Sequence, residues 1–177
     1  MSGLHRLLPL LVLAVLAATP ARAQVEPQIF NAFAVVVANG TIVRAAEKEF
    51  MVVGTIAGPF FIETEEGPVE SGKVVCAASV RIDQATAKTG GGGACTFTAQ
   101  DGAAAWGEWQ CEGYMVVGCR GTLKLAGGNG RLAGITGEGT MIWRPNAREL
   151  NPQLEGATLQ NITGILLWRD FKIAGRQ

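Results

Sequence analysis

The sequence predicts an all-β protein, on three observations. Apolar and polar residues alternate over several short segments, turn-forming residues separate these segments, and helical periodicity is weak throughout. Glycine supplies 24 of the 177 residues, about twice its usual share of ~7%. Turn signals at this spacing indicate an antiparallel sandwich or barrel.

Three segments have the alternation of a strand with one buried face. In residues 95–100, Cys95, Phe97 and Ala99 share one face and polar residues occupy the other. Residues 74–82 and 119–125 repeat the pattern. We expect each segment to be a half-buried antiparallel strand.

Turns are expected where glycine adjoins asparagine, aspartate, proline or further glycines. These positions are residues 39–40, 58–59, 67–68, 90–93, 101–102 and 127–130. Residues 44–49 and 146–150 are each expected to form a turn of helix within a loop.

The first 23 residues have the organisation of a secretory signal peptide. His5 and Arg6 precede an apolar run, and Ala21-Arg22-Ala23 fits a cleavage site. The run is well short of the ~20 residues that span a bilayer, so we expect no stable membrane insertion. Residues 24–177 are then a single domain of a secreted or periplasmic protein.

His5 is the only histidine, and it leaves with the signal peptide. The mature chain then has no imidazole for a Ser-His-Asp or Cys-His relay or for metal ligation. We expect no metal and no cofactor. Loss of Arg6 and Arg22 leaves 13 basic against 15 acidic residues, a balance that gives no electrostatic reason to expect nucleic acid as a partner.

Four cysteines in an exported chain predict two disulfides. We favour the pairs Cys76–Cys95 and Cys111–Cys119, because the second closes a short loop between two strand-like segments. A bridge from Cys95 to Cys111 across the turn at residues 101–102 is the alternative. A metal or redox site is disfavoured because there is no C-x-x-C pair.

Three segments are apolar on both faces, namely residues 34–38, 50–53 and 165–168. In a barrel, one face of each would be exposed. Either loops or a terminal segment cover these faces, or they form a subunit interface. We expect a homo-oligomer.

The most distinctive stretch is the glycine-rich segment 127–141. The spacing Gly128-x-Gly130-x-x-Ala133 matches a dinucleotide fingerprint, but the required helix does not follow. We interpret residues 127–130 as a tight hairpin turn that sets the register of a strand beginning at Arg131. On this interpretation the turn determines folding and is not a binding site.

Residues 127–134 read Gly-Gly-Asn-Gly-Arg-Leu-Ala-Gly. They resemble the Gly-Gly-Thr-Gly-x-aromatic-x-Gly pattern of the allene oxide cyclase barrel-like group, which includes dirigent proteins, and Asn129 and Leu132 depart from it. The resemblance implies an antiparallel up-and-down β-barrel of about eight strands, often dimeric or trimeric, with a pocket for a hydrophobic small molecule at one mouth. Some members of the group cyclise or steer a ligand by pocket shape, without metal or cofactor.

Two carboxylates are candidates for such a pocket. Glu138 lies between two glycines, and Glu108 shares its strand face with Trp106. A carboxylate beside an aromatic ring is a common arrangement for an acid of raised pKa. The alternative for both residues is an outward, solvated position.

Trp109, Trp143 and Tyr114 are candidates to line a ligand, with plain core packing as the alternative. The leading hypothesis is a secreted β-barrel that binds a small, largely apolar ligand or a partner chain, without evident catalytic apparatus. One alternative is a cofactor-free cyclase, isomerase or stereo-directing protein. Another is a structural, oligomer-forming envelope protein.

Overall fold

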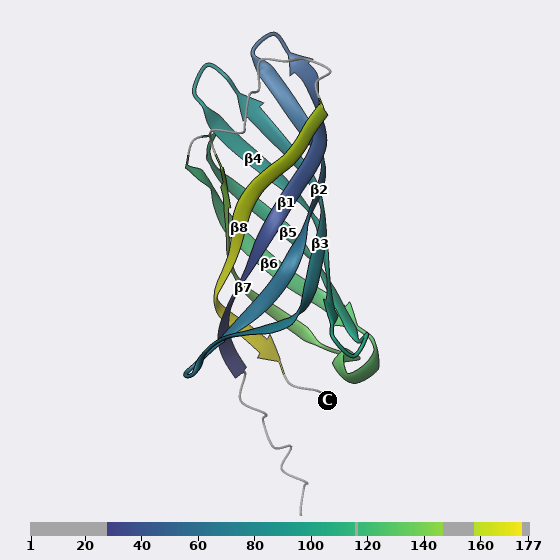
Figure 1. Cartoon of the computed structure of the whole chain (residues 1–177). Coiled ribbons are helices and arrows are strands. Elements are labelled where there is room, and N and C mark those ends of the chain that lie inside the picture. Colours follow the sequence, from purple (N-terminus) through teal and green to yellow (C-terminus); the bar gives the residue numbers. More distant parts are fainter. Residues whose placement is uncertain (1–27, 116, 147–157, 175–177) are drawn as a thin grey trace, which may run out of the picture.

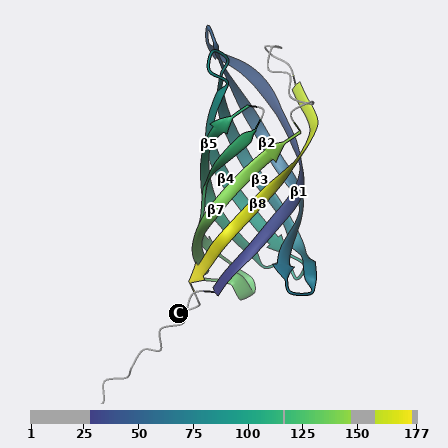
Figure 2. The same ribbon diagram turned by 90° about the vertical axis from the view of Figure 1, so that its left-hand side faces the viewer.

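The computed structural model describes residues 28–115, 117–146 and 158–174, which form one closed barrel of eight antiparallel strands in chain order (Figure 1; Figure 2). The strands are β1 (Gln28–Ala46), β2 (Glu49–Thr64), β3 (Gly67–Asp83), β4 (Lys88–Ala99), β5 (Ala104–Tyr114), β6 (Gly118–Gly128), β7 (Thr136–Pro145) and β8 (Thr158–Ala174). A 3-10 helix, η1 (Gly130–Leu132), lies between β6 and β7. The predicted fold class is confirmed, whereas the expected signal peptide lies outside the described residues.

Each strand pairs with its neighbour in sequence, and β1 also pairs with β8 to close the barrel. The end at which β1 begins and β8 ends is called the lower end, as in Figure 1, and the other the upper end. The turns β2–β3, β4–β5 and β6–β7 lie at the lower end. No helix in the described ranges is long and apolar enough to cross a membrane.

Alternate residues of each strand face the barrel interior, as the sequence pattern predicts. Cys95 is buried, and Phe97 packs against the buried core from the same face of β4. In β3, Val74, Cys76 and Ile82 are buried. The predicted inward faces of residues 74–82, 95–100 and 119–125 are therefore confirmed.

The expected turn is correct at residues 101–102, where Gly102 has positive φ. The turn expected at residues 67–68 lies instead at residues 65–66, and Gly67, which also has positive φ, begins β3. The turns expected at residues 39–40, 58–59 and 90–93 are wrong, because these residues lie within β1, β2 and β4. Glycine serves there for close approach of neighbouring backbones. A Cβ on Gly40, for example, would lie 2.7 Å from the carbonyl oxygen of Val53 on β2.

Three further expectations fall on loops. The helical turn expected at residues 44–49 is wrong, because β1 runs to Ala46 and β2 begins at Glu49. That at residues 146–150 lies, after Asn146, outside the described residues. Past the glycine-rich turn the next strand begins at Thr136, not Arg131, because η1 intervenes.

Two β-bulges in β8 each face an asparagine of β1. Asn161 and Asp170 have φ of 58° and 50°, and the register between β1 and β8 shifts at both places. The Asn161 amide donates to Oδ1 of Asn39, and the Asp170 amide donates to Oδ1 of Asn31, each over 3.0 Å. The two asparagine side chains thus satisfy amides that the bulges remove from the ladder.

Both favoured disulfides are present, Cys76–Cys95 and Cys111–Cys119. The first joins directly opposed residues of β3 and β4, and the second joins β5 to β6 on a diagonal. All four cysteines are buried in the barrel interior. The bridges therefore pin two strand pairs from the inside.

Removal of either bridge is expected to destabilise the barrel by about 2 to 5 kcal/mol. Because the bridged residues are separated by 19 and 8 positions, loop-closure entropy makes loss of Cys76–Cys95 about 0.8 kcal/mol more costly than loss of Cys111–Cys119. Urea unfolding of the two double cysteine-to-alanine variants measures this difference. A larger loss for the Cys111–Cys119 pair would show that packing, and not chain entropy, sets the order.

Candidate functional site

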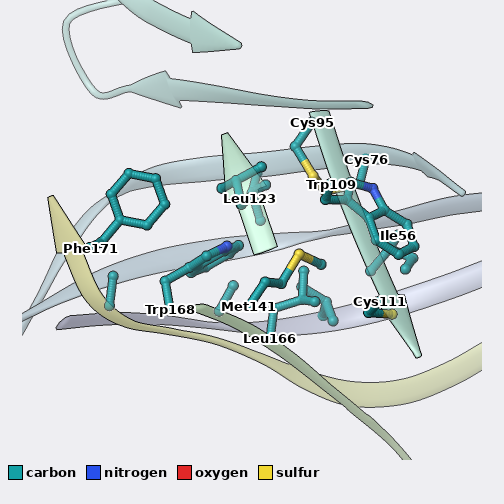
Figure 3. Packing of buried hydrophobic residues seen from close by; sticks show 14 of the residues in the cluster. Ile56, Cys76, Cys95, Trp109, Cys111, Leu123, Met141, Leu166, Trp168 and Phe171 are labelled. Carbon is teal, nitrogen blue, oxygen red and sulfur yellow. A yellow bond between two sulfur atoms is a disulfide. The ribbon is translucent and has the colours of Figure 1, made fainter. Parts of the chain in front are cut away.

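The barrel interior is filled in its middle and hollow at both ends. Figure 3 shows packed side chains of this middle layer, which we call the partition. Its buried residues are Val36, Val74, Cys76, Cys95, Trp109, Cys111, Met141 and Leu166. None of them lines either of the two apolar pockets described below.

Trp109 holds the partition together by reaching across three strands. It projects from β5 beside Gly93 of β4, its partner in register. Its Nε1 donates a hydrogen bond to the carbonyl oxygen of Ala77 on β3, over 3.3 Å. A Cβ at Gly93 would lie 1.9 Å from that carbonyl oxygen and 3.1 Å from the indole nitrogen, so both the β3 backbone and the indole require glycine at this position.

The upper pocket, called the Trp143 pocket, has a volume of ≈ 90 Å³. Its lining includes Val52, Ile56, Val80, Ile162 and Trp143, together with Tyr114. The Trp143 ring lies against β8 where Gly164 leaves room, since a Cβ there would be 2.5 Å from ring carbon Cη2. The walls are thus mainly aliphatic, with two aromatic rings, those of Trp143 and Tyr114.

The lower pocket, called the Trp168 pocket, has a volume of ≈ 130 Å³. Its walls carry five aromatic rings, those of Phe30, Phe60, Phe97, Trp168 and Phe171. Nε1 of Trp168 is buried and has no hydrogen-bond partner within the described part of the chain. These rings could not be predicted as pocket residues from the sequence, because only the barrel register brings four distant strands together here.

The structure places both candidate carboxylates on the outer surface. Glu108 and Glu138 are exposed and line neither pocket. Lys124 lies between them in register, and Lys172 follows Glu138 on β8. They belong to a solvated row of alternating charges, because their strand positions are one residue out of phase with the inward face.

The aromatic candidates separate into two groups. Trp143 and Tyr114 line the upper pocket, and Tyr114 is half exposed. Trp109 is buried in the partition, which is the core-packing alternative. Of the five candidates, the structure therefore brings together Trp143 and Tyr114.

The glycine-rich segment covers one wall of the lower pocket. Leu132 and Ile135 line that pocket, and so does Arg131. Asp101 accepts a 3.1 Å hydrogen bond from the Ala103 amide and forms a 2.5 Å ion pair with Arg131, and these contacts lower the pKa of its carboxyl group. Residues 131–135 therefore contribute to the wall of the lower pocket, whereas none of residues 127–130, the expected folding turn, lines either pocket.

The described residues hold no group of three or more His, Cys, Asp or Glu side chains that could bind a metal ion. No known family model, curated protein or solved structure matches the chain. The pockets themselves are therefore the basis for a function.

We expect Gly93→Val to destabilise the barrel by about 2 kcal/mol or more, because the new side chain would meet the Ala77 carbonyl of β3 and the Trp109 indole. Gly90→Val is the matched control in the same strand, since a Cβ at Gly90 meets nothing within 4 Å. Urea unfolding and near-ultraviolet circular dichroism report stability and indole packing. Equal stability of the two variants would contradict the assigned role of Gly93.

Proposed function

We propose that this protein binds a small, largely apolar molecule in the Trp143 pocket, at the upper end of the barrel. The observation that carries the proposal is an apolar cavity of ≈ 90 Å³ whose floor is the partition and whose lining includes the half-exposed Tyr114. A cavity of this kind favours an alkyl group inside and a polar group at the rim. Thr89 and Asn39 also belong to the lining and offer hydrogen-bonding groups.

The lining favours binding over acid–base catalysis. Neither pocket has an aspartate or glutamate among its described lining residues. A cyclase or isomerase that lacks histidine needs such a group, a lysine or a tyrosine, and Tyr114 is the one of these in the Trp143 pocket. The hollow ends favour ligand binding over a purely structural role.

Two wider assignments are part of the same proposal. The glycine-rich segment supports a relationship to the allene oxide cyclase barrel-like group, for which a closed barrel with an end pocket is expected. The two disulfides support export, because such bonds persist in oxidising compartments.

We expect 1-hexanol to bind the Trp143 pocket saturably and to shift the indole N–H resonance of Trp143, identified with Trp143→Phe. Ala78→Leu narrows the pocket and should weaken binding by about tenfold or more. Ala94→Leu on the exposed outer face of β4 is the matched control and should bind normally. Absence of saturable binding, or equal affinity in Ala78→Leu, would contradict the proposal.

The outer surface supports a second proposal, self-association. Outward residues of β2, β1, β8 and β7 form a continuous apolar strip, which we call the outer apolar face: Phe33, Val35, Val37, Ala57, Pro59, Phe61, Ile142, Ile165 and Leu167. Val35 and Ile165, directly opposed in register, are 52% and 43% exposed. Phe33 and Phe61 stack with ring centroids 5.1 Å apart.

A second copy of this chain is the partner that the outer apolar face fits. In a two-fold contact each face meets a copy of itself, so a charged face would repel its mate. The nine residues of this face are uncharged, and Arg144 lies at its edge beside Ile165. Three strands ~4.8 Å apart, with about five residues of each at ~3.4 Å, give a face of roughly 250 Å², to which β7 adds Ile142 alone. That area suits the apolar centre of an interface burying ~800 Å² per partner.

Val35→Asp and Ile165→Asp are expected to convert dimers into folded monomers, because each would place unpaired charge in the buried centre of the interface. Thr122→Asp, on the exposed outer face of β6, is the control and should leave the dimer intact. Sedimentation equilibrium measures the mass of each variant. A monomeric wild-type protein at high concentration would refute self-association and leave the face to another partner.

A further inference from the structure

The Trp168 pocket differs in chemistry from the upper pocket. Phe60, Phe97 and Trp168 meet edge to face, with ring centroids 5.2 to 5.7 Å apart. Phe30 and Phe171 form a second ring pair at 5.4 Å. These rings come from β1, β2, β4 and β8, so the pocket is a ring-lined cavity assembled around the circumference of the barrel.

A segment of fixed conformation covers this pocket. Residues 129–135 turn back over the lower end, where Leu132 and Ile135 join the lining. The Asn129 amide donates to the Ala104 carbonyl over 2.8 Å, and the Ala104 amide donates to Oδ1 of Asn129 over 2.7 Å. Together with the ion pair between Arg131 and Asp101, these contacts hold the segment against the β4–β5 turn.

The volume of this pocket and the aromatic side chains of its wall together indicate which kind of ligand it binds. An apolar cavity of ~150 Å³ in a protein core holds benzene, and this one measures ≈ 130 Å³. An inserted aromatic ring would continue the edge-to-face packing, which is worth about 0.5–1.5 kcal/mol per pair beyond area burial. A saturated ring of the same size would gain the burial and not the ring contacts.

We propose that the Trp168 pocket is a second ligand site, separated from the Trp143 pocket by the partition, and that it takes a single aromatic ring of about the size of benzene. The glycine-rich segment forms one wall of this site through Leu132 and Ile135. A polar substituent on the ring would face Ser71, Thr98 or Arg131, the polar members of the lining. The barrel is then a carrier with two chemically distinct ends.

The test compares toluene with methylcyclohexane, and two pocket-filling variants with each other. Ala105 is buried in the lining of the Trp168 pocket, so Ala105→Leu should weaken toluene binding by about tenfold or more. Ala78→Leu, which narrows the other pocket, should leave toluene binding unchanged while weakening 1-hexanol. Affinities come from ligand titrations followed by NMR of the mature protein.

Leu132→Ala provides a second variant at a half-buried position of the cover and should weaken toluene binding by about threefold. Toluene affinity unchanged in both Ala105→Leu and Leu132→Ala would overturn the site. Equal affinity for toluene and methylcyclohexane would contradict the proposed preference of the pocket for an aromatic ring. If toluene bound as expected and 1-hexanol did not bind, the proposed ligand site in the Trp143 pocket would be refuted, and the proposed site in the Trp168 pocket would be unaffected.

Discussion

The interior of this barrel depends on the contact of large aromatic rings with glycines on neighbouring strands. The interior of an eight-stranded barrel has room for its own side chains and at most a small ligand, so a large ring that lies against a neighbouring strand needs a small residue there. Trp109 lies against Gly93, Trp143 against Gly164, and Phe171 against Gly139, where a Cβ would lie 2.6 Å from a ring carbon. The high glycine content therefore serves packing as much as turns.

The pair formed by Trp109 and Gly93 explains why the middle of the barrel is filled. With Trp109 lying across β4 and hydrogen-bonded to β3, the middle of the barrel is closed by side chains, and two buried disulfides fix the strands around it. The remaining space is divided between the two ends. Rings concentrate at the lower end and aliphatic side chains at the upper end, so the two pockets offer different chemistry to a ligand.

The outer surface also has two chemically different regions, one charged and one apolar. Around β5 to β8, Glu108, Lys124, Glu138 and Lys172 alternate in sign across adjacent strands, an arrangement that suits contact with water. In the outer apolar face, which runs from β2 through β1 to residues 165–167 of β8 and Ile142 of β7, the outward residues are apolar instead. Because strand residues alternate between faces, a segment that is apolar at every position must carry one set of apolar side chains outside, and residues 34–38 of β1 and 165–168 of β8 do so.

The sequence by itself determined the all-β class, the inward faces of β3, β4 and β6, and the favoured disulfides, because alternation and cysteine spacing are local properties. It misplaced the turns at Asn39–Gly40 and Gly90, since a glycine that makes room for a neighbouring backbone or ring reads like a glycine that turns the chain. Only the tertiary structure decided which residues line a pocket. Phe30, Phe97 and Trp168 meet through barrel closure, and Glu138 is outside because register sets each side chain's face.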